Sequence, residues 1–242
     1  MRYLANFSYD GSKYFGYQKQ KGASSIQEDL ERALTLINNK SVHVCASGRT
    51  DAGVHANGQC AHFDIDVNIT PDKLKRALNS LLDCNIYIKS IVEVPDTFHA
   101  RFDVKQKEYI YKINIGEYSP FTKDYVYQYC KPLNVSSMKS AIKLFEGEHN
   151  FKSFTKANVE TNNFVRIIYS TDVSVIDDII IIKFVGNGFM RYMVRNMVGF
   201  LIEIGEGKRN ISDVNSVLLE EDRTKAGKTA PPEGLYLNKV TY

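Results

Sequence analysis

The sequence contains no tryptophan, no low-complexity segment, no internal repeat and no apolar run near the roughly 20 residues that a membrane-spanning helix needs. A strand-like pattern starts at once at the N-terminus, so we expect no signal peptide. These absences predict a globular, cytoplasmic protein that has no membrane partner. With 242 residues, 43% of them hydrophobic, the chain is long enough for one large domain or two small ones with a full core.

Residue pairs typical of metal sites and disulfide frameworks are also missing. There is no C-x-x-C pair and no H-x-x-x-H pair. We therefore expect reduced, buried thiols at the four cysteines, which are Cys45, Cys60, Cys84 and Cys130. Asp51, His55 and His62 could be imagined as metal ligands, but their spacing is generic, so the sequence predicts no metal.

A strong excess of one charge is absent too. The net charge is +3, which is too small to indicate a nucleic-acid-binding protein by itself. Local basic clusters would have to contact any RNA phosphates. Candidates for these contacts, each of which could equally be an ordinary solvated side chain, are Lys105, Lys107, Lys112, Arg166 and Arg191.

What the sequence does contain is one unusual connection, residues 47–56, with an arginine, an aspartate and two glycines. Alternating runs at 42–46 and 59–64 flank it and predict strands, so Asp51 would lie on a loop tip held by a sheet. Glycines there permit unusual backbone angles and the close approach of another chain. The plain alternative is a hairpin turn, for which Asp-Gly alone would suffice.

The first half of the sequence predicts a split βαβ unit. Strands are expected at 3–9, 42–46, 59–64 and 86–94, with helices after the first and third strands. Ser25 and Glu28 form a capping box at the start of the first helix, and Pro71 takes the favoured first position of the second. The order strand, helix, strand, strand, helix, strand is typical of ferredoxin-like folds.

The second half repeats this layout loosely, with one extra helix. Helices are expected at 137–145, 189–204 and 212–219; strands are expected at 108–113, at 125–129, from 165 onward, at 179–184 and from 235. We therefore predict an α+β fold of two ferredoxin-like halves, with mainly antiparallel sheets and a cleft between them. The domains would be 1–103, with the Asp51 loop, and 104–242, which completes an RNA-binding cleft.

The helix at 189–204 combines an apolar ridge with two arginines. The ridge, typical of a core helix, comprises Met193, Met197 and Leu201. Arg191 and Arg195 are four residues apart and would share a helical face. An arginine buried in such a helix needs a carboxylate partner, and Asp51 is the candidate partner of Arg195. Ordinary surface exposure of both arginines is the alternative.

Five segments together resemble the tRNA pseudouridine synthase A family. They are residues 9–18, 48–56, 98–102, 186–199 and 230–235, in the family's order along nearly the whole chain. Residues 48–56 resemble the family's signature motif most closely. The one departure is Tyr17, which stands where the family usually carries tryptophan, and it would affect packing beside the first loop.

The resemblance implies roles for individual residues. Asp51 would be the catalytic nucleophile, Tyr109 would contact the target uracil, and Arg49 would replace the flipped base in the stack. Leu235 would line the pocket, and Arg195 would pair with Asp51. Without the resemblance, Tyr109 and Leu235 would be interpreted as core residues and Arg49 as a solvated loop arginine.

The implied reaction isomerises uridine to pseudouridine at positions 38 to 40 of the tRNA anticodon stem-loop, in a homodimeric enzyme. It involves no net redox change and no carried group, so it requires no cofactor. The Asp51 carboxylate could add to ribose C1′ or to uracil C6, and both routes stay open. A pairing with Arg195 would lower the pKa of Asp51. The target base would have to flip out of the stem-loop.

Three other functions compete with this one. A ferredoxin-like sheet with exposed aromatic residues could be a non-catalytic RNA-binding module. A hydrolase could use Asp51 and His55. A pseudouridine synthase could also act on a different RNA.

Overall fold

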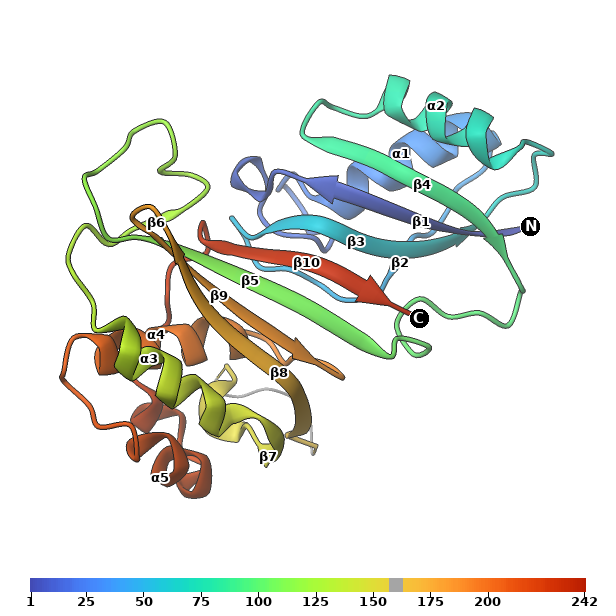
Figure 1. Cartoon of the computed structure of the whole chain (residues 1–242). Helices are drawn as coiled ribbons and strands as arrows, with labels where there is room; N and C mark the ends of the chain where they lie inside the picture. The colour runs from blue at the N-terminus through green and yellow to red at the C-terminus, as the bar shows by residue number, and fades with distance from the viewer. Residues whose placement is uncertain (157–162) are drawn as a thin grey trace. The chain divides into compact units, whose positions relative to one another are not determined.

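The computed structural model describes residues 1–156 and 163–242 (Figure 1). The chain forms two compact units, one of Met1–Lys105 with Tyr236–Tyr242 and one of Gln106–Leu235. The elements of the first unit are β1 (Arg2–Tyr9), η1 (Gly11–Lys13), α1 (Ile26–Asn38), β2 (Cys45–Ala46), β3 (His55–Asp64), α2 (Pro71–Leu81), β4 (Ile86–Val94) and β10 (Leu235–Thr241).

The sheet of the first unit is mainly antiparallel. β1 lies between β4 and β3 and runs antiparallel to both, and β2 pairs antiparallel with β3. β10 pairs parallel with the start of β3, at His55 and Ala56. Side chains of β1 alternate as predicted, with Tyr3 and Phe7 among those buried. Both helices pack on one face of this sheet, where Leu30 of α1 and Leu78 of α2 line the same small cavity as Phe7.

The two helices of the first unit begin where the sequence predicts. The Ser25 side chain accepts a hydrogen bond from the Glu28 backbone N–H (3.3 Å), which confirms the predicted cap of α1. α2 starts at Pro71 and buries Leu78. Leu81, at the last turn of the helix, is 39% exposed.

The strands of the second unit are also mainly antiparallel. Its elements are β5 (Gln106–Asn114), β6 (Tyr127–Gln128), α3 (Val135–Ile142), η2 (Lys143–Phe145), β7 (Gly147–Asn150), η3 (Lys152–Phe154), β8 (Val165–Ile176), β9 (Ile179–Gly186), α4 (Met193–Gly205), α5 (Asp213–Glu220) and η4 (Arg223–Ala226). β5, β9, β8 and β7 pair antiparallel in that order, while β6 pairs parallel with β5. The strand predicted at 125–129 is therefore reduced to two residues.

Helix α4 starts later than the sequence predicts. Tyr192 has a left-handed backbone (φ 65°), which an L-residue does not adopt inside a right-handed helix, so α4 begins only at Met193. Arg191 precedes the helix, and the predicted helical face shared by Arg191 and Arg195 is therefore wrong. The predicted apolar ridge is confirmed, because Met193, Met197 and Leu201 are all fully buried.

The four cysteines are free thiols, but the prediction that all are buried is wrong. Cys60 is buried, Cys45 and Cys130 are half-buried, and Cys84 is exposed on the turn before β4. Within the residues that the structure describes, no helix has both the length and the apolar character needed to cross a membrane.

Candidate active-site loop

The loop that carries Asp51, residues 47–54, joins β2 to β3 and is fixed at its base by buried polar groups. The Ser47 hydroxyl donates to Gln59 Oε1 (2.7 Å), and Gln59 Nε2 donates to the Gly48 carbonyl (3.0 Å). Ser47 and Gln59 are both fully buried. A buried network in which every polar group has a hydrogen-bond partner is rigid, because breaking one of these bonds would leave a buried polar group that water cannot reach.

Thr50, the residue before Asp51, is held through its side chain and its backbone. Its hydroxyl shares a buried hydrogen bond with the Tyr9 hydroxyl (2.8 Å), and its carbonyl accepts from the Tyr17 backbone N–H (3.1 Å). Burial raises the pKa of Tyr9 to about 12, so this hydroxyl stays neutral at physiological pH. The backbone is therefore held in place at the residue directly before Asp51.

Two glycines let the segment after β1 pack directly on this loop. A side chain at Gly11 would overlap the carbonyl of Val54. Gly16 has φ +100°, and a Cβ there would lie 2.9 Å from the carbonyl oxygen of Thr50. The loop thus depends on backbone contact with residues 11–17, which belong to one of the segments singled out in the sequence.

His55, the first residue of β3, ties the loop to two other segments. Its Nδ1 accepts from the Gly11 N–H (3.1 Å) and lies 3.3 Å from Asp10 Oδ1. Its ring stacks on Tyr236 of β10, with the ring centroids 4.7 Å apart. His55 is only 2% exposed, so it is poorly placed to act as the base of a hydrolase.

Asp51 and Arg49 are more accessible than the residues around them. Asp51 is half-buried and Arg49 is exposed, whereas Thr50 between them is buried. The loop therefore combines an immobilised backbone with two charged side chains that a ligand could reach. A nucleophile needs this arrangement, because the position of the residue that carries it is then fixed before the substrate binds.

Arg195 of α4 lies among aromatic and carbonyl groups of the second unit. Its Nε donates to the Ala230 carbonyl (2.8 Å), and its guanidinium lies 5.0 Å from the centre of the Tyr192 ring. The positive charge of Arg195 favours the ionised forms of Tyr111 and Glu233. Burial has the larger effect on Glu233 and raises its pKa. The predicted pairing of Arg195 with Asp51 joins residues of different units, and it stays a prediction.

Arg195 is half-buried, whereas the predicted site residues Tyr109 and Leu235 are buried. Tyr109 of β5 is 8% exposed and meets Phe189 edge-on, with ring centroids 5.1 Å apart. Leu235 is 6% exposed, and its N–H donates to the Pro232 carbonyl (2.9 Å). Their roles in binding, which the resemblance implies, stay predictions.

The predicted phosphate-binding residues differ in accessibility. Lys105 and Arg191 are exposed; Lys107, Lys112 and Arg166 are half-buried. The Arg191 guanidinium lies 5.3 Å from the centre of the Tyr192 ring. Tyr192 therefore makes cation–π contacts with one arginine that precedes it in the chain and with another, Arg195, that follows it. Sequence reasoning did not select Tyr192, although its position between two arginines was visible.

Other supporting residues were also missed. Tyr9 was predicted as the last residue of a strand and as part of the matching segment 9–18, and neither it nor Thr50, Ser47 and Gln59 was given a role of its own. Their signal in the sequence is weak: they are polar or aromatic residues next to the motif or at its ends. Among the described residues, a close group of potential metal ligands consists of Cys45, His62 and His99 and includes neither Asp51 nor His55.

Comparison with known proteins identifies similar chains. A family profile described as tRNA pseudouridine synthase matches residues 5–103 and 141–242. A protein of Geobacillus sp. (strain WCH70) named tRNA pseudouridine synthase A is 46% identical over 243 residues, covering 100% of this chain and 98% of that protein. Proteins of the same name from Listeria monocytogenes serotype 4a and Pseudothermotoga lettingae are 44% and 43% identical, each covering 100% of this chain and 99% of the relative.

A chain of the solved structure titled "Crystal Structure of a Cbf5-Nop10-Gar1 Complex" aligns with this one at 13% identity and a TM-score of 0.37. The alignment covers 80% of this chain and 46% of the chain in that structure. This likeness is too weak to support a conclusion.

Proposed function

Since the chain belongs to the tRNA pseudouridine synthase family, it isomerises uridine to pseudouridine in tRNA, and we propose that Asp51 is the nucleophile of that reaction. The observation that carries this proposal is the loop itself. Its backbone is fixed by Ser47, Thr50 and Gln59, while the Asp51 side chain stays partly accessible.

The proposed chemistry is covalent. The Asp51 carboxylate adds to ribose C1′, with the C1′–N1 bond breaking, or to uracil C6 before that bond breaks. The freed uracil rotates while it stays bound, and C5 forms the new bond to C1′. In the first route the bond between Asp51 and C1′ breaks in this step. N1 takes up a proton and the C5 proton is lost; in the second route the bond between Asp51 and C6 breaks as that proton leaves. The atoms balance without a redox cofactor or a carried group, because substrate and product are isomers.

Other side chains would orient the reactants. Arg195 would pair with Asp51 and keep it ionised, and its Nε–H···Ala230 bond would fix the direction of the guanidinium. Tyr109, held edge-on by Phe189, would contact the uracil. The exposed Arg49 would take the place of the flipped base.

We further propose that the fold has two ferredoxin-like halves, divided at 103/104, with an RNA-binding cleft between them. The first unit supports this: its strands lie in the order β4, β1, β3, β2, and all neighbours are antiparallel. The proposal includes a cytoplasmic homodimer, positions 38 to 40 of the anticodon stem-loop as targets, and Leu235 as part of the pocket.

The experiment is to map pseudouridine in tRNA transcripts incubated with the purified chain. New pseudouridine at positions 38, 39 or 40 is the expected result. Modification elsewhere would favour a synthase with another target. Retention of tRNA without any modification would favour a non-catalytic RNA-binding module and contradict the proposal.

A further inference from the structure

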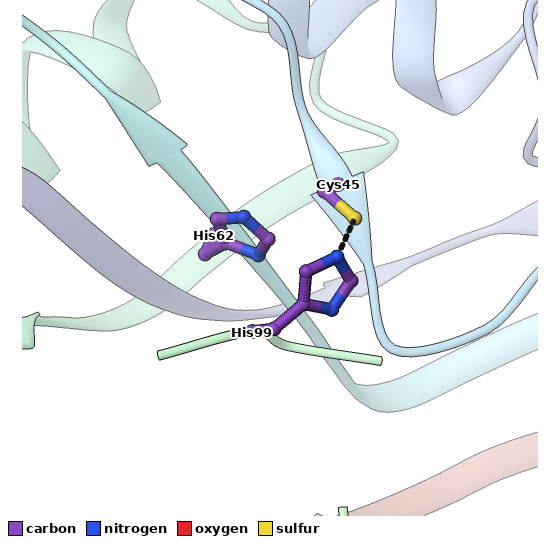
Figure 2. Close-up of side chains that lie close together, drawn as sticks. All are labelled: Cys45, His62 and His99. Carbon is purple, nitrogen blue, oxygen red and sulfur yellow. Dashed lines mark hydrogen bonds between the residues drawn. The ribbon is translucent and has the colours of Figure 1, made fainter. Parts of the chain in front are cut away.

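Three side chains of the first unit, none of them in the Asp51 loop, lie close together (Figure 2). Cys45 lies on β2, His62 on β3, and His99 in the segment that follows β4. Cys45 and His62 are direct partners in the β2–β3 ladder, so their side chains emerge on the same face. One potential ligand atom from each of the three lies within 4.8 Å of the other two.

The spacing of this group suits a tetrahedral metal ion. Cys45 Sγ and His99 Nε2 are 3.6 Å apart. Zinc bonds of about 2.3 Å to sulfur and about 2.1 Å to nitrogen, at the tetrahedral angle, place these atoms about 3.6 Å apart. The rings of His62 and His99 meet edge to face, with centroids 4.9 Å apart. His62 would need to shift by about 1 Å to complete the ligand set.

We propose that Cys45, His62 and His99 form a Zn²⁺ site, with a water molecule as the fourth ligand. One thiolate with two imidazoles is a donor set that zinc prefers over magnesium or calcium, which favour oxygen. Cys45 and His99 are half-buried, so solvent can reach the site and supply the water.

The protonation states can adapt to the metal. The Nδ1 atoms of His62 and His99 accept from the backbone N–H groups of Ala100 (3.1 Å) and Arg101 (3.2 Å). Zinc at Nε2 would move the ring proton to Nδ1 and break both hydrogen bonds. The backbone around Ala100 and Arg101 would therefore have to shift when the metal binds, so that these N–H groups no longer face protonated Nδ1 atoms.

Three arginines, Arg2, Arg49 and Arg101, act on the Cys45 thiol, so the charge of the thiolate has to offset positive neighbours as well as the metal. Arg2 is occupied by Asp64, to which it donates two hydrogen bonds of 2.9 and 2.8 Å. Metal binding deprotonates the Cys45 thiol and introduces one negative charge. That charge offsets part of the metal's charge and the nearby charge of Arg101.

The site lies outside the proposed reaction. It would tie the segment around His99, which follows β4, to the β2–β3 ladder that supports the Asp51 loop. The inference does not depend on the proposed reaction, since it uses no residue of that mechanism.

The test uses the full chain, stripped with a chelator and titrated with Co²⁺, whose thiolate complexes have a charge-transfer band in the near ultraviolet. We expect saturation near one Co²⁺ per chain in the wild type and in the control variant Cys84→Ser. Cys45→Ser should lose the band, and His99→Gln should weaken binding more than tenfold. A wild-type chain without the band, or a band unchanged in Cys45→Ser, would overturn the proposal.

A second measurement needs no variant. The cysteines of the stripped wild-type chain are alkylated with and without Zn²⁺, and the rate at each is read by mass spectrometry. Zinc should slow the alkylation of Cys45 more than tenfold and leave that of the exposed Cys84 unchanged. An equal rate at Cys45 in both conditions would contradict the site.

Discussion

Tyr17 is a buried residue whose hydroxyl has no hydrogen-bond partner among the residues that the structure describes. Its backbone N–H holds the carbonyl of Thr50, but its ring is only 2% exposed, and burial raises the pKa of its hydroxyl well above the ordinary value. The nearby Tyr9 hydroxyl, in contrast, is satisfied by Thr50. The two tyrosines allow a matched comparison.

We predict that Tyr17→Phe leaves the free energy of unfolding unchanged or raises it by up to about 1 kcal/mol, because an unpaired buried hydroxyl is removed. Tyr9→Phe should lower it by about 1 to 2 kcal/mol, because Thr50 is left without its partner. Urea denaturation of both variants measures the difference. Equal destabilisation by the two substitutions would show that the Tyr17 hydroxyl is satisfied.

At the scale of elements, the segment after β1 and the Asp51 loop are held together by backbone contact. We predict that Gly11→Ala lowers both stability and activity strongly, because a methyl group would overlap the Val54 carbonyl. Gly22→Ala is the control, since its Cβ would meet open space and it incurs only the left-handed backbone strain of about 1 to 2 kcal/mol. Thermal unfolding and tritium release should separate the two variants. If Gly11→Ala resembled the control, the packing described for this loop would be incorrect.

β1 and β3 are joined at their ends by an ion pair whose pH dependence can be predicted. Hydrogen bonds from Arg2 hold the pKa of Asp64 below its ordinary value near 3.8. A lowered pKa in the folded state means that the pair stabilises the fold above the unfolded pKa and that this contribution is lost as pH falls through the folded one. The Asp64 side chain is 58% exposed, so the effect is small and sensitive to salt.

The measurement is urea denaturation of the wild type and Asp64→Asn between pH 6 and pH 2.5. The wild type should be modestly more stable at pH 6, and the difference should vanish toward the acid end. A difference that stayed constant over this range would contradict the linkage.

At the scale of the whole molecule, periodic hydrophobic patterns in the sequence predicted most of the helices and strands. The remaining elements and boundaries depend on local contacts and backbone angles that these patterns do not contain. The alternation of β1 and the cap at Ser25 are local signals, and both were confirmed. β7 was missed because Gly147–Asn150 is short and polar. The start of α4 was misplaced because the left-handed Tyr192 gives no sign in the hydrophobic pattern.

The candidate site was predictable to a similar degree. The motif made Asp51 a candidate directly, because a charged residue between glycines is visible in the sequence, and its role stays a prediction. The hydrogen bonds that fix its loop, from Tyr9 to Thr50 and between Ser47 and Gln59, depend on which strands are neighbours. His99 comes close to Cys45 for the same reason, although 53 residues separate them in the chain.

The nucleophilic role of Asp51 is tested most directly by tritium release from tRNA labelled at C5 of uridine, under single-turnover conditions. Asp51→Asn, which keeps the size of the side chain, should bind tRNA and fold like the wild type but release no tritium above background. Asp66→Asn, an exposed aspartate outside the loop, should release it at the wild-type rate. Undiminished release by Asp51→Asn would contradict the account.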